Sequence, residues 1–292
     1  MLRHLGRLAA SLASVLALGL AGSAAAEPAL WTIKDHDSTI YLFGTIHVLK
    51  PDTQWRSARI DKALASSGDL TLEIIGADDP AVMQPLIIKY GLDPAHPLST
   101  KVTPAVFEHA SKAAADSGVP AQVLNMMRPW MAAVSLSMAP VIKAGYDPRS
   151  GVEQVLTKEV VAAGKPEHAF ETPEQQIRFF GDLPPKTEAD FLSATLDDVD
   201  EGVGKIDAMV AAWAAGDTVE LEKEFISEMK GDYPELYDLL IVKRNENWAQ
   251  QLKTKLAGAG VSFVAVGSGH LVGPDSVQVQ LAKLGIKAER VE

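Results

Sequence analysis

Two segments of the sequence end in a histidine that follows an apolar, strand-like run and a glycine. They are GTIH at 44–47 and GSGH at 267–270. A glycine at the end of a strand lets the backbone turn sharply and approach a ligand closely. In open α/β sheets, ligands collect outside the carboxyl ends of the strands. We therefore expect His47 and His270 to converge at one edge of a sheet, although they are far apart in the chain.

A glutamate inside an apolar segment is the third candidate. Glu73 lies toward the carboxyl end of the predicted strand 70–75 (LTLEII), where burial without a partner costs free energy. Two histidines and one carboxylate suit Zn, Mn, Co or Fe, and such a metal can activate water for hydrolysis. Structural roles stay open at this point: each histidine can be a cap or a surface side chain, and Glu73 an ordinary edge-strand residue.

Absent residues and motifs narrow the chemistry. The chain has no cysteine, which excludes a cysteine nucleophile, thiolate-bound zinc and an iron–sulfur cluster. It also lacks HExxH, the GxSxG nucleophile elbow and the GxxxxGK[ST] phosphate loop. Any metal must therefore be held by histidine, carboxylate and water.

The predicted strands lie mostly toward the two ends of the chain, and helical patterns fill the middle. Strands are predicted at 29–34, 38–43, 70–75, 167–171, 261–266 and 286–291. Helices are predicted at 57–66, 173–181, 186–215, 217–230, 234–257, 276–284 and through much of 79–164, with interruptions at Pro129 and Pro140 and at Gly202 or Gly204. The pattern predicts an α/β (mixed α+β) fold. Its N- and C-terminal strands share a central mixed sheet, and a large helical insertion separates them in a single domain, 27–292.

The first 26 residues have the pattern of a secretory signal peptide. Arg3 and Arg7 precede an apolar run at 8–21, and small residues follow to Ala26. The run is shorter than the roughly 20 residues of a spanning helix. We expect cleavage near Ala26, a periplasmic or secreted protein, and no stable membrane span after processing; an uncleaved anchor is the alternative.

The charge balance bears on partners. Asp+Glu number 38 against 27 Lys+Arg, a net charge of -11. Phosphate backbones and anionic lipids both attract basic surfaces, so a nucleic-acid or lipid-surface partner is not expected. The sequence does not determine the oligomeric state.

Both ends of the chain resemble the TraB/GumN family, which includes the pheromone-shutdown proteins and is related to the Tiki metalloproteases. The resemblance covers 27–292 and is most specific in segments 30–57 and 261–285. In that family, paired GxxH motifs accompany an acidic residue on an early strand and a late arginine. His47, His270 and Glu73 match the first two features. Arg244, in KRNENW, matches the late Arg-Asn pair.

The resemblance implies a divalent-metal-dependent hydrolase, with peptidase activity in the Tiki branch and a peptide or small-molecule substrate. His47, His270 and Glu73 are then the expected ligands of Mn, Co or Zn, with Glu73 either a ligand or the general base. Arg244 is expected to hold a substrate carboxylate or stabilise an oxyanion; a surface arginine paired with a nearby acid is the alternative. Glu171 and Glu153 match further acidic segments and form a second tier of site residues.

The implied fold is also related to erythromycin esterases and haem-binding ChaN-like proteins. One scaffold can host both hydrolysis and ligand binding. A non-catalytic periplasmic protein that binds haem or another small ligand is therefore the alternative function.

Overall fold

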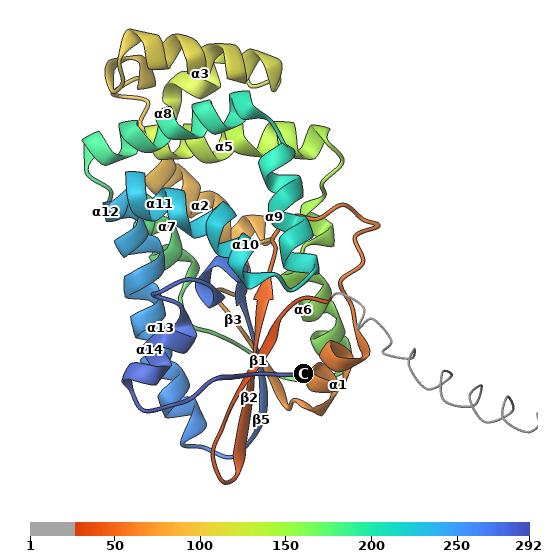
Figure 1. The fold of residues 1–292 in the computed structure, drawn as a ribbon. Coiled ribbons are helices and arrows are strands. Elements are labelled where there is room, and N and C mark those ends of the chain that lie inside the picture. The colour runs from red at the N-terminus through yellow and green to blue at the C-terminus, as the bar shows by residue number, and fades with distance from the viewer. Residues whose placement is uncertain (1–26) are drawn as a thin grey trace, which may run out of the picture.

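The computed structural model describes residues 27–292, so the predicted signal peptide lies outside the described residues. A six-stranded mixed sheet forms the centre of the molecule (Figure 1). Its strand order is β4-β3-β5-β2-β1-β6. The strands are β1 (Leu30–Lys34), β2 (Ser38–Thr45), β3 (Asp69–Leu72), β4 (Glu167–Ala169), β5 (Gly260–Gly267) and β6 (Glu289–Arg290).

Strands from the two ends of the chain are direct neighbours in the sheet. β2 and β5 run parallel, with Gly44 opposite Val266 and Thr45 opposite Gly267. β3 and β4 continue the parallel part, while β1 is antiparallel to both β2 and β6. The predicted α/β class, with terminal strands sharing one mixed sheet, is confirmed. The carboxyl ends of β2, β5 and β3 therefore meet at one edge.

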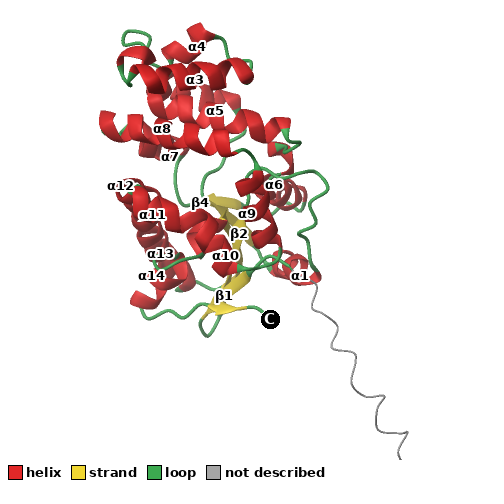
Figure 2. Ribbon diagram, turned by 45° about the horizontal axis from the view of Figure 1, so that its top comes forward, coloured by secondary structure: helices red, strands yellow, loops and turns green. Residues whose placement is uncertain are grey.

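The central strands are apolar on both faces, as strands buried in the middle of a parallel sheet are. On one face Ile40 and Leu42 of β2 pack with α13 and α14. On the other face Phe43 packs with side chains of α1, α6 and α9. Figure 1 shows α13 and α14 on one side of the sheet and α1 and α6 on the other. A third apolar cluster lies among α3, α4, α5 and α8, which form a helical layer beyond the sheet (Figure 2).

Helices make up most of the chain between β3 and β5. The α-helices are α1 (Ala58–Ser66), α2 (Pro80–Gly91), α3 (Pro104–Asp116), α4 (Ala121–Met126), α5 (Pro129–Lys143), α6 (Val152–Ala162), α7 (Pro173–Gly181), α8 (Pro185–Glu201), α9 (Gly204–Ala214), α10 (Thr218–Glu222), α11 (Glu228–Asp232), α12 (Pro234–Tyr237), α13 (Lys243–Leu256) and α14 (Val277–Lys283). Two π-helical segments, η3 (Lys223–Ser227) and η4 (Asp238–Val242), connect α10 to α11 and α12 to α13. Short 3-10 turns are η1 (Leu98–Thr100), η2 (Pro148–Ser150) and η5 (Ser268–Leu271).

Several predicted boundaries change. Gly202, at φ +82°, separates α8 from α9 as expected, and α4 ends before Pro129. Pro140, however, lies inside α5 without ending it. β3 ends at Leu72, so Glu73 follows the strand instead of lying within it. None of the helices in residues 27–292 is both long enough and apolar enough to cross a bilayer.

Candidate active site

The two GxxH histidines and the early glutamate meet around Gly267, the last residue of β5. A Cβ atom placed on Gly267 would lie 3.1 Å from Oε1 of Glu73, 3.6 Å from Cδ2 of His270 and 3.8 Å from Nε2 of His47. The space that a side chain would fill is therefore bordered by all three residues. A side chain at this position would crowd Glu73 and project into the site.

Glu73 is buried and fully hydrogen-bonded. Its Oε1 accepts the backbone N–H of Gly267 at 2.7 Å. Its Oε2 accepts from Nε2 of Gln176 at 3.1 Å and from the guanidinium of Arg244. Burial alone raises the pKa of Glu73, but the positive charges of Arg244 and His47 and the N–H of Gly267 more than offset it and hold the pKa below its usual range. The carboxylate is charged at neutral pH.

His270 is held as a neutral imidazole with a defined tautomer. Its Nδ1 lies 2.6 Å from Oδ1 of Asn245, whose Nδ2 donates to the carbonyl of Asp275 at 2.8 Å. Because that amide faces Asp275 with its NH₂ group, Nδ1 of His270 must be the donor to Oδ1. Its Nε2 therefore carries a lone pair, 3.9 Å from Oε1 of Glu73. Burial lowers the pKa of His270 to about 3.

His47 has a carboxylate where His270 has an amide. Its Nδ1 lies 2.7 Å from Oε1 of Glu153, which also accepts from the hydroxyl of Thr45. The negative charge of Glu153 raises the pKa of His47 to about 9, although the side chain is 69% exposed. The other ring nitrogen, Nε2, faces the space beside Gly267. In many metal-binding histidines, one ring nitrogen is hydrogen-bonded to a carboxylate and the other binds the metal.

The start of α6 holds His47 and Glu153 together. Gly151 precedes α6 so closely that a Cβ there would lie 2.1 Å from the carbonyl oxygen of His47. The next residue, Val152, donates its backbone N–H to Ile46 at 3.0 Å. The Gly-x-Glu segment therefore has a physical basis: the glycine allows the backbone contact, and Glu153, in the first turn of α6, reaches the imidazole.

Arg244 is the hub of the network and is not on the surface of α13. Its Nε and Nη2 each donate to Glu171 at 2.9 Å, and Nη2 also donates to Glu73. Its Nη1 donates to Nε2 of His270 at 3.1 Å and to the carbonyl of Leu240 at 3.3 Å. A guanidinium has five N–H groups, and these contacts use all five. In this arrangement Arg244 has no N–H left for a substrate carboxylate or oxyanion.

Aromatic rings and a helix cap fix the orientation of this hub. The guanidinium carbon lies 4.7 Å from the ring centre of Trp248 and 5.3 Å from that of Phe179. The indole N–H of Trp248 donates to Glu171 at 3.0 Å. Thr172 and Gln175 form a reciprocal capping box at the start of α7, which fixes the segment that carries Glu171. Trp248 is therefore a buried supporting side chain and not the wall of a groove.

An open cleft of about 540 Å³ leads to the site. Its lining includes His47, Glu73 and Glu153 and continues along the loop after β3. A second cavity of about 430 Å³ is lined by Arg244 and Glu171, among other residues. The first cleft gives a substrate access to His47 and Glu73.

The imidazoles of His47 and His270 and the carboxylate of Glu73 are groups that bind divalent metals, although their ligand atoms are not closely grouped. Both histidines have Nδ1 bound to an acceptor, which leaves each Nε2 as a potential ligand beside the charged Glu73. Within the described part of the chain, however, only Asp35, His36 and Asp37 bring three ligand atoms within 4.8 Å of one another. An ion shared by His47, Glu73 and His270 therefore requires these side chains to move closer together. It also has to displace the proton that the raised pKa keeps on His47, and it competes with Arg244 for Nε2 of His270.

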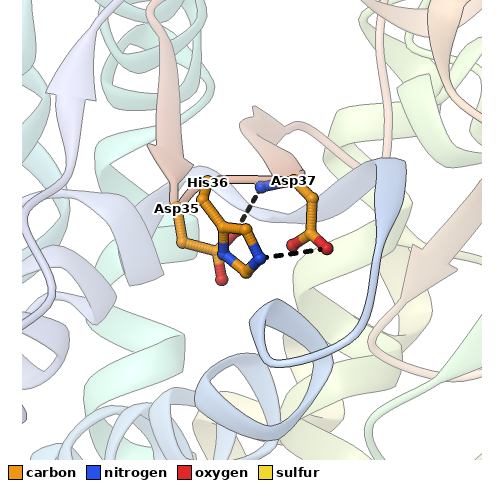
Figure 3. A group of neighbouring side chains, drawn as sticks. All are labelled: Asp35, His36 and Asp37. Atoms are coloured by element: carbon orange, nitrogen blue, oxygen red, sulfur yellow. Dashed lines mark hydrogen bonds and ion pairs between the residues drawn. The ribbon is translucent and has the colours of Figure 1, made fainter.

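The Asp35-His36-Asp37 group is explained by its turn (Figure 3). It lies between β1 and β2, at the amino end of β2, and is exposed. Oδ1 of Asp35 accepts the backbone N–H groups of Asp37 at 3.2 Å and Ser38 at 2.8 Å, which is an Asx-type turn. The candidate site lies beyond the opposite, carboxyl end of β2. This group is therefore not evidence of a bound metal.

Every charged residue of the site was predicted from the sequence, but several supporting residues were not. Asn245 follows Arg244 in the Arg-Asn pair, and only its position in that pair drew attention to it. Gln176 gave no signal beyond a polar helix start. Arg128, which precedes α5, has a structural role outside the site, since it donates to the carbonyls of Tyr90 and Gly181 and to Glu188.

Replacing Asn245 with alanine tests the tautomer assignment. The fully buried N–H of His270 would lose its acceptor, which we expect to cost about 1–3 kcal/mol of stability. The ring would also become free to place its proton on Nε2. The ¹⁵N chemical shifts of the His270 ring should then change from those of the Nδ1–H tautomer to values averaged over both tautomers. Asn247→Ala, at an exposed position of the same helix, is the matched control; equal ¹⁵N shifts in both variants would contradict the assignment.

The fold and site together define a class of α/β proteins with a histidine–glutamate centre at the carboxyl edge of a mixed sheet. Residues 29–290, nearly the whole chain, match the TraB/PrgY/gumN family, and the chain belongs to that family. No curated protein and no solved structure matches it. The match over residues 29–290 establishes the family, and the residues around Gly267 are the basis for any statement about the chemistry.

Proposed function

We propose that this protein is an exported, divalent-metal-dependent hydrolase with peptidase-like activity. The observation that carries the proposal is the arrangement around Gly267, where Nε2 of His47 and Oε1 of Glu73 border one space together with the ring of His270. The open cleft beside it supports a substrate larger than water. Family membership supports the same class.

His47, Glu73 and His270 are the residues that would hold the metal, identified here only as Mn, Co or Zn. A bound divalent ion supplies Lewis acidity, which polarises a carbonyl and makes water more acidic. The protein supplies the rest. Glu153 and Asn245 fix the two imidazoles, and the charged Glu73 is placed to accept a proton from water. Arg244 keeps Glu73 charged and oriented.

Export is the second part of the proposal. It is supported by the signal-peptide pattern of residues 1–26 and by the acidic, cysteine-free composition. Fractionation of cells that express the full chain should recover a shortened protein, cleaved near Ala26, outside the cytoplasm. Recovery of the full-length chain in the membrane would contradict cleavage.

The experiment that tests the hydrolase combines metal binding with peptide cleavage. Glu73→Gln removes the proton acceptor but keeps the side-chain size. We expect it to lower the cleavage rate by at least about 10²-fold, whereas Glu246→Gln, an exposed change on α13, should leave the rate unchanged. His47→Ala should lower the bound-metal content measured by elemental analysis.

The rival function, a non-catalytic ligand-binding protein, predicts a different result. The saturation of Arg244 and its contact with His270 favour it, because the site is satisfied without a metal. It predicts ligand affinity, such as haem binding, that survives Glu73→Gln. A protein that binds no metal and cleaves no peptide would overturn the hydrolase.

A further inference from the structure

β4 is an edge strand beside the candidate site. Only β3 pairs with it in the sheet, and it is the terminal strand on that side. Leu70 lies opposite Glu167, and Leu72 lies opposite Ala169. The residue after Leu72 is Glu73, so the carboxyl end of β4 lies level with the catalytic carboxylate. The other edge of β4 is therefore a neighbour of the site.

The hydrogen bonds to β3 fix which backbone groups of β4 face outward. Leu70 donates to the carbonyl of Pro166 at 3.1 Å, and Phe170 donates to the carbonyl of Leu72 at 3.0 Å. In a parallel ladder the bonding residues alternate. The N–H and C=O groups of Glu167 and Ala169 consequently point away from β3. Within residues 27–292, no other hydrogen-bonding group meets them. Two residues of β4 thus offer free backbone donors and acceptors.

One residue of β4, Glu167, also lines the cleft beside the site. Glu167 lines the cleft of about 540 Å³ together with His47 and Glu73, and the exposed His168 follows it on the strand. A chain paired with β4 would have to turn across the carboxyl ends of β3 and β5 to reach His47, and the cleft that Glu167 and His47 both line offers that path. The free edge and the candidate catalytic groups are connected by a space that a substrate can occupy.

The lining of the cleft indicates the chemistry of that chain. Its charged side chains are mostly carboxylates: Glu73 and Glu153, which have partners, and Asp78 and Glu167; no lysine or arginine lines it. Ile74 and Ile75, the latter 42% exposed, add an apolar wall. Carboxylates beside an apolar wall favour a segment that carries both a positive charge and aliphatic side chains.

We propose that the free edge of β4 binds the substrate as an added strand, and that the substrate is an extended polypeptide segment with basic and aliphatic residues. Backbone hydrogen bonds to Glu167 and Ala169 supply affinity, and alternate side chains of the segment contact the cleft. The identity of the bound segment as a substrate rests on the proposed hydrolase function, while its mode of binding does not.

The direct test is binding of a fluorescein-labelled Lys-Val repeat peptide, followed by anisotropy. Ala169→Pro removes one outward N–H at a position where an edge strand tolerates proline. We expect it to weaken binding by at least about tenfold, whereas Ala169→Ser, which keeps the N–H, binds as the parent does. Melting temperatures of both variants should stay close to that of the parent.

A scan of N-methylated peptides gives a second readout that does not depend on any variant folding. N-methylation should weaken binding at every second residue and leave the residues between unaffected, since only alternate amides face a neighbouring strand. Uniform sensitivity along the peptide would overturn the proposal. So would sedimentation showing that β4 pairs with a second copy of the chain.

The outcomes also separate this inference from the proposed function. Periodic, proline-sensitive binding without cleavage would refute the hydrolase and support the added strand. The opposite result would be cleavage of the same peptide with no alternation in the N-methylation scan and no effect of Ala169→Pro. It would support the hydrolase and refute the added strand. Replacing the lysines of the peptide with glutamate should abolish binding if the carboxylates of the cleft attract positive charge.

Discussion

Replacing Arg244 with methionine should lower the free energy of unfolding by about 3–5 kcal/mol, the range seen when one member of a buried ion pair is removed. The side chain of Arg244 is only 9% exposed, and its loss leaves Glu73 and Glu171 without the guanidinium that pairs with both of them. Urea unfolding of the parent and variant measures the difference. Arg178→Met is the matched control, because its pair with Asp182 is half exposed and should contribute little to stability.

The same variant reports on the metal. With the guanidinium gone, Glu73, Glu171 and the lone pair of His270 face one another and are free to bind a cation. Mn²⁺ or Zn²⁺ should therefore raise the melting temperature of Arg244→Met more than that of the parent protein. Equal shifts in both would show that Arg244 and a metal do not compete. A loss of stability no greater than that of Arg178→Met would contradict the role of Arg244 as the central charge.

Gly151→Ala should have the second large effect. The added methyl group would lie 2.1 Å from the oxygen and 2.8 Å from the carbon of the His47 carbonyl, so the backbone must move. Overpacking of this kind costs up to about 3 kcal/mol. Displacing His47 by an ångström is also expected to lower any cleavage rate by about 10²-fold. Urea unfolding and the peptide cleavage assay measure the two effects.

The control for this substitution is Gly204→Ala at the start of α9. A Cβ there meets no atom within 4 Å, and the backbone is not in the left-handed region. Alanine should stabilise the helix slightly, by up to about 1 kcal/mol. If Gly151→Ala were as harmless as Gly204→Ala, the close contact between α6 and the His47 loop would not exist in solution.

The sheet was predictable because its central strands carry runs of β-branched and aliphatic residues. Such runs are typical of strands that are buried on both faces of a sheet. The convergence of His47 and His270 followed from the shared order of apolar run, glycine and histidine. The two π-helical segments were not predicted: 217–230 and 234–257 were each expected to be a continuous helix, whereas Lys223–Ser227 and Asp238–Val242 are π-helical. The short β6 also differs from the predicted strand 286–291, because only Glu289 and Arg290 pair with β1.

The site was predictable in its charged residues but not in their bonding. The sequence could not indicate that Arg244 is saturated, because that depends on Leu240 and His270 meeting the same guanidinium. It also could not distinguish the partners of the two imidazoles. Glu153 and Asn245 reach them from α6 and α13, and only the packing of these helices on the sheet makes the choice.

The position of β5 in the sheet has a consequence for synthesis of the chain. Because β5 lies between β2 and β3, the strand that joins the two halves of the sheet is among the last to be made. A chain stopped before residue 260 contains a β1–β2 hairpin and a β3–β4 pair, each with an unpaired apolar edge. Such edges bind chaperones and attract proteases. Incomplete chains that end before residue 260, and therefore lack His270, should be degraded faster than the full-length chain.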